Sequence, residues 1–264
     1  TSSDKFNGSN RTNEITSTGT AADGSRQSKW TLGNPTNYAL VFDGNNDLVS
    51  HSMDLATSSS ASISTWFMKK GGDDAIQHLV MFNDADVPSY GTRILVGADN
   101  KLFFSIQDGS ETQAQSIKST GTYTASSLWY HVAATWNKNI IPSAADFKIY
   151  VNGVDVTDGT SYVSGPSSYD TDFATNIDEG TIGADNRTGT PTEFFNGIID
   201  EVSIWSTVLS TAQIQSLFIQ GRNFSATNIE SGSLAGYWNF QNSFNDASGN
   251  SNHGTNTGAT FTGI

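Results

Sequence analysis

The stretch FFNGIIDEVSIWSTVLSTAQIQSLF, residues 194–218, combines a strand pattern with a helix pattern. Its first half, GIIDEVSIW, has the length and apolar content of a strand whose side chains alternate between the two faces of a sheet. In the second half, Ser210 and Gln213 have the spacing of a capping box, and Gly221 lies where a helix can end. A single apolar stripe follows the cap, formed by Ile214, Leu217 and Phe218. The stretch therefore predicts a strand followed directly by a short helix near 210–220.

Two adjacent carboxylates, Asp200 and Glu201, interrupt this strand. They could be catalytic, could hold a cation, or could fix a sheet edge in place. On a regular strand they point to opposite faces, whereas a retaining glycosidase needs its two carboxylates about 5 Å apart on one side of a sugar. A buried carboxylate needs a cation or several N–H groups as partners. Because the chain has only 13 Lys and Arg residues, we expect calcium at one of the two or at both.

Short strands with turn signals between them fill the rest of the chain from residue 37 onward. SISTWFM (62–68) and WYHVAATW (129–136) alternate with period two, as strands do. In FKIYVNGVDV (147–156), Asn152 and Gly153 can adopt the positive φ angles of a type I′ turn, which predicts a hairpin. About a dozen strands and one helix indicate an all-β protein built from two packed antiparallel sheets.

The chain divides into a polar beginning and one long patterned region. Residues 1–36 are mostly Ser, Thr, Asn and Gly, which predicts a polar arm or linker. Residues 37–264 contain no linker and no repeat of domain length, so we expect a single domain. The segment 232–264 carries Trp238 and Phe240, which need a core, and we expect its strand to belong to this domain. Because the chain starts without Met, we expect it to be processed or excised from a longer protein.

Seven motifs in a fixed order give the sequence a resemblance to a known family. From residue 39 on, it resembles the bacterial and viral laminin G-like domains of the concanavalin A-like lectin/glucanase superfamily. The motifs are the opening stretch, ALVFDGNNDLV (39–49), ASISTWFMKK (61–70), SLWYHVAATW (127–136), FKIYVNGVDV (147–156), GTIGADN (180–186) and AGYWNFQNSFNDASGNSNHGT (235–255). The last motif often opens such a domain, but here it comes last. The resemblance implies an antiparallel two-sheet jelly-roll sandwich.

The charge of the chain argues against several classes of partner. The net charge is −13 and the pI is about 4.4. Nucleic acid is itself a polyanion, and no cluster of Lys and Arg offsets the acidic charge, so we expect no binding to nucleic acid. No apolar run reaches the roughly 18 residues that span a bilayer, so we expect no membrane insertion. Cys is absent, which excludes disulfides and thiolate chemistry.

Acidic turns near both ends of the patterned region are candidates for a calcium site. FDGNND supplies Asp43 and Asp47, and NDASGNSNHG supplies Asp246. Together with Asp200 they offer the carboxylate oxygens that calcium prefers, and the resemblance adds support, since such jelly rolls often carry a structural calcium. The alternative is ordinary turn chemistry, in which Asp and Asn bond to their own backbone.

Neither the residues nor the resemblance favours catalysis. Laminarinase-like relatives carry Glu-x-Asp-x-Glu on one strand, and this motif is missing here. Lectin-like binding needs aromatic and polar side chains in loops. Three loops have this composition, and their candidate ligand-binding residues are Tyr90, Tyr162, Tyr169 and Arg187.

These observations predict a non-catalytic, extracellular carbohydrate-binding or adhesion module. Its expected partner is a glycan or a cell-surface polysaccharide. The first alternative is a structural or decoration protein of a virion or surface appendage, with neighbouring protein subunits as partners at a cell or virion surface. The second alternative, a glycoside hydrolase or lyase, is disfavoured because no paired carboxylates share one strand face.

Overall fold

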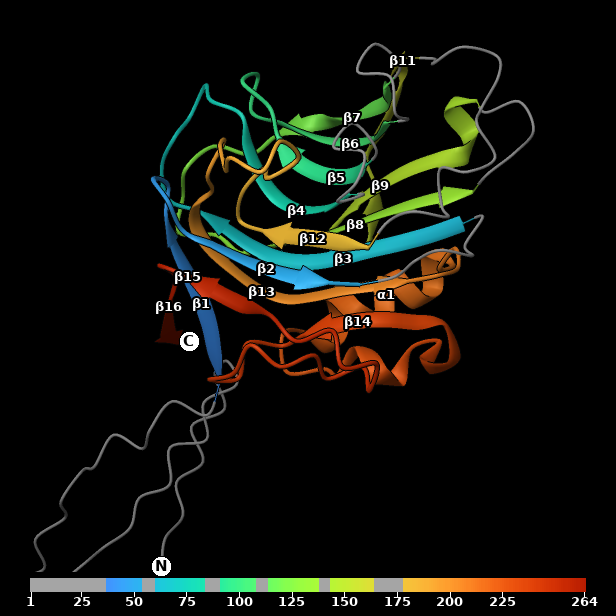
Figure 1. The fold of residues 1–264 in the computed structure, drawn as a ribbon. Helices are drawn as coiled ribbons and strands as arrows, with labels where there is room; N and C mark the ends of the chain where they lie inside the picture. The colour runs from blue at the N-terminus through green and yellow to red at the C-terminus, as the bar shows by residue number, and fades with distance from the viewer. Residues whose placement is uncertain (1–36, 54–59, 84–90, 108–113, 138–142, 164–177) are drawn as a thin grey trace, which may run out of the picture.

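The computed structural model describes residues 37–53, 60–83, 91–107, 114–137, 143–163 and 178–264. The expected polar arm, 1–36, lies outside the described residues. Sixteen strands in the described part of the chain form two eight-stranded sheets packed face to face, with one α-helix outside them (Figure 1). Every strand pair in this part of the chain is antiparallel. The all-β, two-sheet jelly-roll class predicted from the sequence is confirmed.

The first sheet, sheet I, contains the strand with the two carboxylates. Its strand order is β10 (Val154–Asp155), β9 (Phe147–Val151), β8 (Tyr130–Asn137), β3 (Ser60–Lys69), β13 (Asn196–Trp205), β1 (Tyr38–Asp43) and β16 (Thr260–Gly263), and β14 (Leu234–Trp238) also pairs with β13. The hairpin between β9 and β10 turns at Asn152 and Gly153, whose φ angles are 50° and 77°. Both values are positive, as the sequence predicts for a type I′ turn.

The second sheet, sheet II, covers the other side of the core. Its strand order is β11 (Thr157–Val163), β7 (Ala114–Thr122), β6 (Lys101–Gln107), β5 (Gly91–Val96), β4 (Gln77–Asn83), β12 (Glu179–Ile182), β2 (Leu48–Ser52) and β15 (Thr255–Thr257). The inward side chains of both sheets form one apolar core. Its largest members with almost no exposed surface are Phe42, Phe67, Phe82, Phe104, Phe147, Phe195, Trp238 and Phe240.

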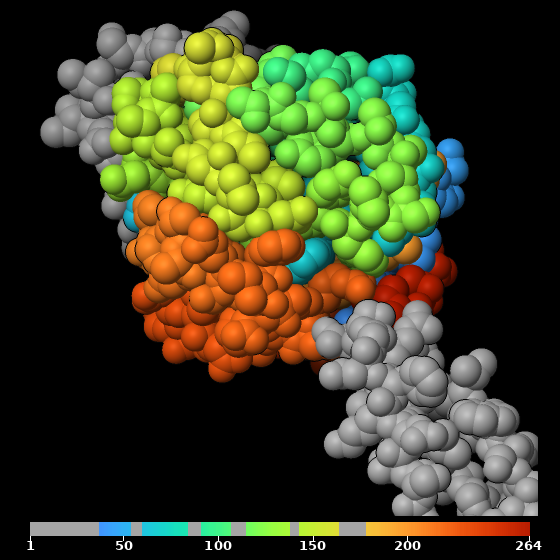
Figure 2. All heavy atoms as spheres, turned by 180° about the vertical axis from the view of Figure 1, so that it is seen from behind, coloured from blue at the N-terminus to red at the C-terminus, as the bar shows by residue number. Residues whose placement is uncertain are grey.

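The helix α1 (Thr211–Gln220) forms as the sequence predicts. Ser210 Oγ accepts a hydrogen bond from the Gln213 backbone N–H, the Ser210 N–H donates to Gln213 Oε1, and Gly221 follows with a φ of 76°. The helix packs on the outer face of sheet I through a second apolar cluster. That cluster consists of Ala133, Tyr150, Trp205, Leu209, Ile214, Leu217, Ala226, Leu234 and Tyr237. From behind, the orange residues that include α1 lie directly against the yellow-green strands (Figure 2).

The described residues also form three short 3-10 helices: Ala144–Asp146 before β9, and Ala226–Asn228 and Ser231–Ser233 between α1 and β14. None of the helices in the described part of the chain is both long enough and apolar enough to cross a membrane.

The C-terminal segment is built into both sheets of the sandwich. β14 and β16 belong to sheet I, and β15 belongs to sheet II. Trp238, at the end of β14, is fully buried and stacks on His51 of β2 with ring centroids 4.1 Å apart. Its indole N–H donates to the Asn252 carbonyl at 2.9 Å. The Trp238 side chain therefore adds to the β15–β2 pairing a second contact between the last segment of the chain and sheet II.

We expect Trp238→Ala to lower the free energy of unfolding by about 3–5 kcal/mol, because it leaves a large cavity in the core. Urea unfolding followed by fluorescence or circular dichroism measures this change. The control is Leu128→Ala, since Leu128 is 61% exposed and its truncation should cost less than about 0.5 kcal/mol. Equal stability of the parent and Trp238→Ala would show that the Trp238 side chain does not stabilise the main core.

Candidate functional site

β13 contains a β-bulge at its two adjacent carboxylates. Its register with β3 shifts between Asp200 and Ser203, and Glu201 has a φ angle of 54°. Ile199 and Val202, on either side, both belong to the core between the sheets. The two residues between them therefore share the outer face of sheet I. The expectation that they point to opposite faces is wrong, because the bulge inserts an extra residue into the alternation.

Both carboxylates are buried beneath the helical layer. Asp200 is fully buried and Glu201 is 8% exposed. The Tyr237 hydroxyl donates to Glu201, and Asp200 Oδ1 accepts from the Glu201 backbone N–H at 3.0 Å. Burial raises the pKa of Glu201 to about 8 and raises the pKa of Asp200 well above its usual range. Arg222, whose guanidinium stacks on Trp129 at 4.1 Å, counteracts both increases in pKa through its positive charge.

A cavity of about 10 Å³ adjoins the bulge. It is lined by Ser64, Trp66, His131, Glu201, Ser203, Leu217, Gly221, Phe224 and Ala226. Ser64 Oγ lies 2.7 Å from His131 Nε2 in its wall. This volume holds about one water molecule and no sugar ring. Among the described residues, the cavity beside Glu201 is therefore too small for a sugar substrate.

Asp43 and Asp47, two of the predicted calcium ligands, lie in one turn. Asp47 Oδ2 accepts from the Asp43 backbone N–H at 2.9 Å, and Asp43 Oδ1 accepts from the Asn45 N–H at 2.8 Å. The hydrogen bond from the Asn45 backbone lowers the pKa of Asp43. The bond from Asn45 is the Asx-turn bond of the alternative interpretation, and the bond to Asp47 closes the same turn from its other end.

Asp246, the third predicted ligand, accepts hydrogen bonds at both of its carboxylate oxygens. Oδ1 accepts from the N–H groups of Tyr237 at 2.9 Å and Ser248 at 2.8 Å, and Oδ2 accepts from the Asn252 N–H at 3.0 Å. The fourth, Asp200, lies four residues along β13 from Asn196, which pairs with Asp43. The four Asp residues do not form a group of three ligand atoms within 4.8 Å in the described part of the chain. Calcium at any of them stays a prediction, checked by comparing melting curves with chelator and with added calcium.

A charged patch lies on the outer face of sheet II and consists of His78, Arg93, Asp185, Arg187 and Glu193. Arg93 is on this face because its neighbour Ile94 points into the core. The other members come from β4 and from the loop 183–195, which leads from β12 to β13. This loop folds back on itself, since Asp185 and Thr192 exchange two backbone hydrogen bonds. It is one of the three loops selected from the sequence.

Ion pairs order the side chains of the charged patch. Arg187 Nε lies 2.9 Å from Asp185 Oδ2, and its terminal nitrogen lies 2.7 Å from the same oxygen. His78 Nδ1 lies 3.2 Å from Glu193 Oε2, and its other nitrogen lies 3.9 Å from Asp185. Arg187 and Glu193 are 27% and 34% exposed, whereas His78 and Asp185 are buried. The patch therefore presents one oriented donor group and one acceptor group to solvent.

Electrostatics in the charged patch favours an ion-pair network over a metal centre. His78, Asp185 and Glu193 are the only three potential metal ligands that come within 4.8 Å of one another among the described residues. Burial lowers the pKa of His78, which favours the neutral ring. Burial, followed by the charge of Arg187, lowers the pKa of Arg93 to about 10, which leaves it a cation. Two guanidinium groups thus balance two carboxylates, and a metal would have to displace Arg187 from Asp185.

The other predicted ligand-binding residues contribute little to this patch. Tyr162 is half-buried on β11, where its hydroxyl donates to Gln115 at 3.2 Å and its ring packs on Phe147. Tyr90 and Tyr169 lie outside the described residues. Sequence reasoning missed Arg93 and His78, although a lone charged residue in the apolar strand RILV was a signal for Arg93.

The family model for the concanavalin A-like lectin/glucanases superfamily matches residues 42–215. The chain belongs to this superfamily. The matched region contains the bulge and the charged patch, and ends within α1. The sequence matches no curated protein at a significant level.

Solved structures share the fold at low sequence identity. One is a protein from Bacteroides ovatus named as a candidate carbohydrate-binding protein, with a TM-score of 0.57 and 18% identity over 90% of this chain and 66% of its own length. Another is a heptameric SAP-like pentraxin from Limulus polyphemus, with a TM-score of 0.50 and 15% identity over 69% of this chain and 82% of its own length. The chain thus spans about two thirds of the Bacteroides protein.

Two kinds of buried group make the stability of this fold depend on pH. Burial lowers the pKa of His51 and of His131 to about 3, so the unfolded chain binds more protons than the folded chain below about pH 6.5. Glu201 acts in the opposite direction. Its pKa of about 8 lets the folded chain keep a proton that the unfolded chain has already released.

We therefore expect the free energy of unfolding to be largest at about pH 6.5 and to fall on both sides. Between about pH 6.5 and about pH 8 the loss from Glu201 should be about 2 kcal/mol, and Asp200, whose pKa is also raised, adds to it in the same direction. Urea unfolding at a series of pH values measures the curve. Glu201→Gln cannot titrate, so it should reduce the alkaline loss and keep the acid side. An unchanged alkaline slope in this variant would contradict the assignment.

Proposed function

We propose that this chain is a non-catalytic, extracellular carbohydrate-binding or adhesion module, and that the charged patch contacts the glycan. The observation that carries the proposal is the partly exposed Arg187, whose guanidinium is already oriented by Asp185. A pre-oriented donor loses little conformational entropy when it binds a sugar hydroxyl or carboxylate. Glu193, on the other side of His78, adds an acceptor. The name of the Bacteroides ovatus structural relative also supports a carbohydrate ligand.

A second candidate function is a structural or decoration protein of a virion or surface appendage. Exposed apolar residues near α1 favour it, because Ile219 is 75% exposed and Val154 is 61% exposed. The hairpin turn before Val154 lies against α1, where a Cβ at Gly153 would contact Phe218. Such residues suit contacts with a neighbouring subunit. A hydrolase or lyase has less support, since the cavity at the buried carboxylates is too small for a sugar.

A glycan array probed with the labelled full chain tests the carbohydrate proposal. We expect at least one glycan to bind, and Arg187→Ala and Glu193→Gln to weaken its affinity by about tenfold or more, since a charge-assisted hydrogen bond contributes about 1.5–3 kcal/mol. Lys148→Ala is the control, because Lys148 lies on sheet I and its pair with Asp155 is partly exposed. Equal binding by all variants would exclude the charged patch. An array without any signal, together with assembly into particles or filaments, would favour the second candidate.

A further inference from the structure

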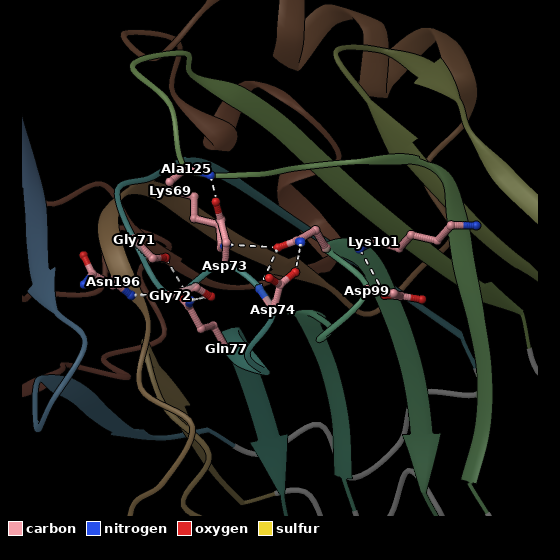
Figure 3. Close-up of polar contacts among 11 residues, drawn as sticks. Lys69, Gly71, Gly72, Asp73, Asp74, Gln77, Asp99, Lys101, Ala125 and Asn196 are labelled. Atoms are coloured by element: carbon pink, nitrogen blue, oxygen red, sulfur yellow. Dashed lines mark hydrogen bonds and ion pairs between the residues drawn. The ribbon is translucent and has the colours of Figure 1, made fainter.

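A polar cluster surrounds Lys69 at one end of the sandwich (Figure 3). Lys69 is the last residue of β3 and is fully buried. Its ammonium contacts the carboxylate of Asp73 and lies 3.2 Å from Asn100 Oδ1. Asp73 is held in place by the Ala125 backbone N–H, which donates at 2.8 Å. A buried primary amine is thus held against a buried carboxamide, beside a carboxylate that is partly exposed.

Hydrogen bonds at both the oxygen and the nitrogen of its amide hold the Asn100 side chain in one orientation. It lies in the turn between β5 and β6, at a φ angle of 58°, and is 8% exposed. Its Oδ1 accepts hydrogen bonds from Lys69 and from the Asp74 backbone N–H, which lies at 3.3 Å. Its Nδ2 donates to Asp74 Oδ1 at 2.9 Å. Donors on one side and a carboxylate on the other also settle which atom of the amide is oxygen.

We propose that Lys69 and Asn100 react with each other to form an intramolecular isopeptide bond between the two sheets. Lys69 ends β3 of sheet I, and Asn100 lies in the β5–β6 turn of sheet II, 31 residues away in sequence. The bond would join Nζ of Lys69 to Cγ of Asn100. This proposal does not depend on the glycan-binding proposal, which rests on Arg187 and Glu193 of the charged patch.

The reaction needs no external reagent. Asp73 accepts a proton from the Lys69 ammonium, and the neutral amine attacks Cγ of Asn100. The Asp74 backbone N–H stabilises the negative charge that develops on Oδ1, as in an oxyanion hole. The Asp74 carboxylate takes a proton from the attacking nitrogen and delivers it to Nδ2, so that the C–N bond breaks and ammonia leaves. Ammonia then takes the proton from Asp73, and the products are a secondary amide and an ammonium ion.

The proximity of the Lys69 amine to the Asn100 carboxamide accelerates the reaction. Holding an amine and an acyl group together in a fixed geometry corresponds to an effective concentration of about 10⁵ M or more. Amides are otherwise unreactive towards amines, which is why exposed Lys and Asn residues on a surface do not couple. The other amide groups of the cluster have no such amine: the Gln77 amide donates to the Gly71 carbonyl at 2.9 Å instead.

Mass spectrometry of the full chain tests the proposal. We expect the intact mass to lie below the sequence mass by one molecule of ammonia, and digestion to release one branched peptide that joins Lys69 to Asn100. Lys69→Arg keeps the positive charge but has no nucleophilic amine, so it should restore the full mass, as should Asn100→Ala. Lys118→Met is the control, because Lys118 pairs with Asp99 at a partly exposed position, and this variant should stay cross-linked.

The variant Asp74→Asn distinguishes loss of the coupling reaction from loss of the fold. It keeps the shape of the side chain but cannot relay the proton, so we expect a folded chain with slowed or absent coupling. The parent measurement alone overturns the proposal if the full sequence mass persists after prolonged incubation. Loss of water with a peptide joining Lys69 to Asp73 would overturn the assignment to Asn100. Loss of ammonia mapped to one unbranched peptide, such as a succinimide at Asn152, would do the same.

Discussion

The β-bulge at Asp200 and Glu201 is the constraint that positions the C-terminal third of the fold. One side of β13 pairs with β3 along its length. The other side pairs with β1 as far as Ile199 and with β14 from Val202 onward. The extra residue and the local twist of a bulge allow two strands to meet end to end along one side of a third. β14 then determines where the helical layer and the last two strands can lie.

The partners that neutralise the buried carboxylates come from the elements that the bulge brings together. Tyr237 belongs to β14 and donates to Glu201. Arg222 lies just beyond α1 and offsets the charge of both carboxylates. A buried carboxylate is costly unless such groups reach it. An acidic pair in an apolar strand can therefore mark a change of strand partner, with a structural role that needs neither substrate nor catalysis.

Local patterns in the sequence were enough to predict the fold class, the capped helix and the β9–β10 hairpin. Each of these patterns, which are the period-two alternation, the capping box and the Asn-Gly turn, involves residues that are close together in the sequence. The bulge was not predictable in this way, since the direction of Asp200 and Glu201 depends on pairing with β1, β3 and β14. The charged patch was predicted only through Arg187 and its loop. Arg93 joins it from another strand, and the alternation that points Arg93 outward becomes informative only once the register of sheet II is known.

The burial of Lys69 is unexpected in a chain with a net charge of −13. Only 13 residues are Lys or Arg, yet one of them is fully buried at the end of β3. Its carboxylate partner, Asp73, is 39% exposed, so solvent screens the attraction that should offset the desolvation of the ammonium. A neutral secondary amide has no such desolvation cost and still satisfies its hydrogen bonds. It would also constrain the unfolded chain as a disulfide does, in a sequence that has no Cys. The same burial that is unfavourable for a lysine is thus favourable for the product of its reaction with Asn100.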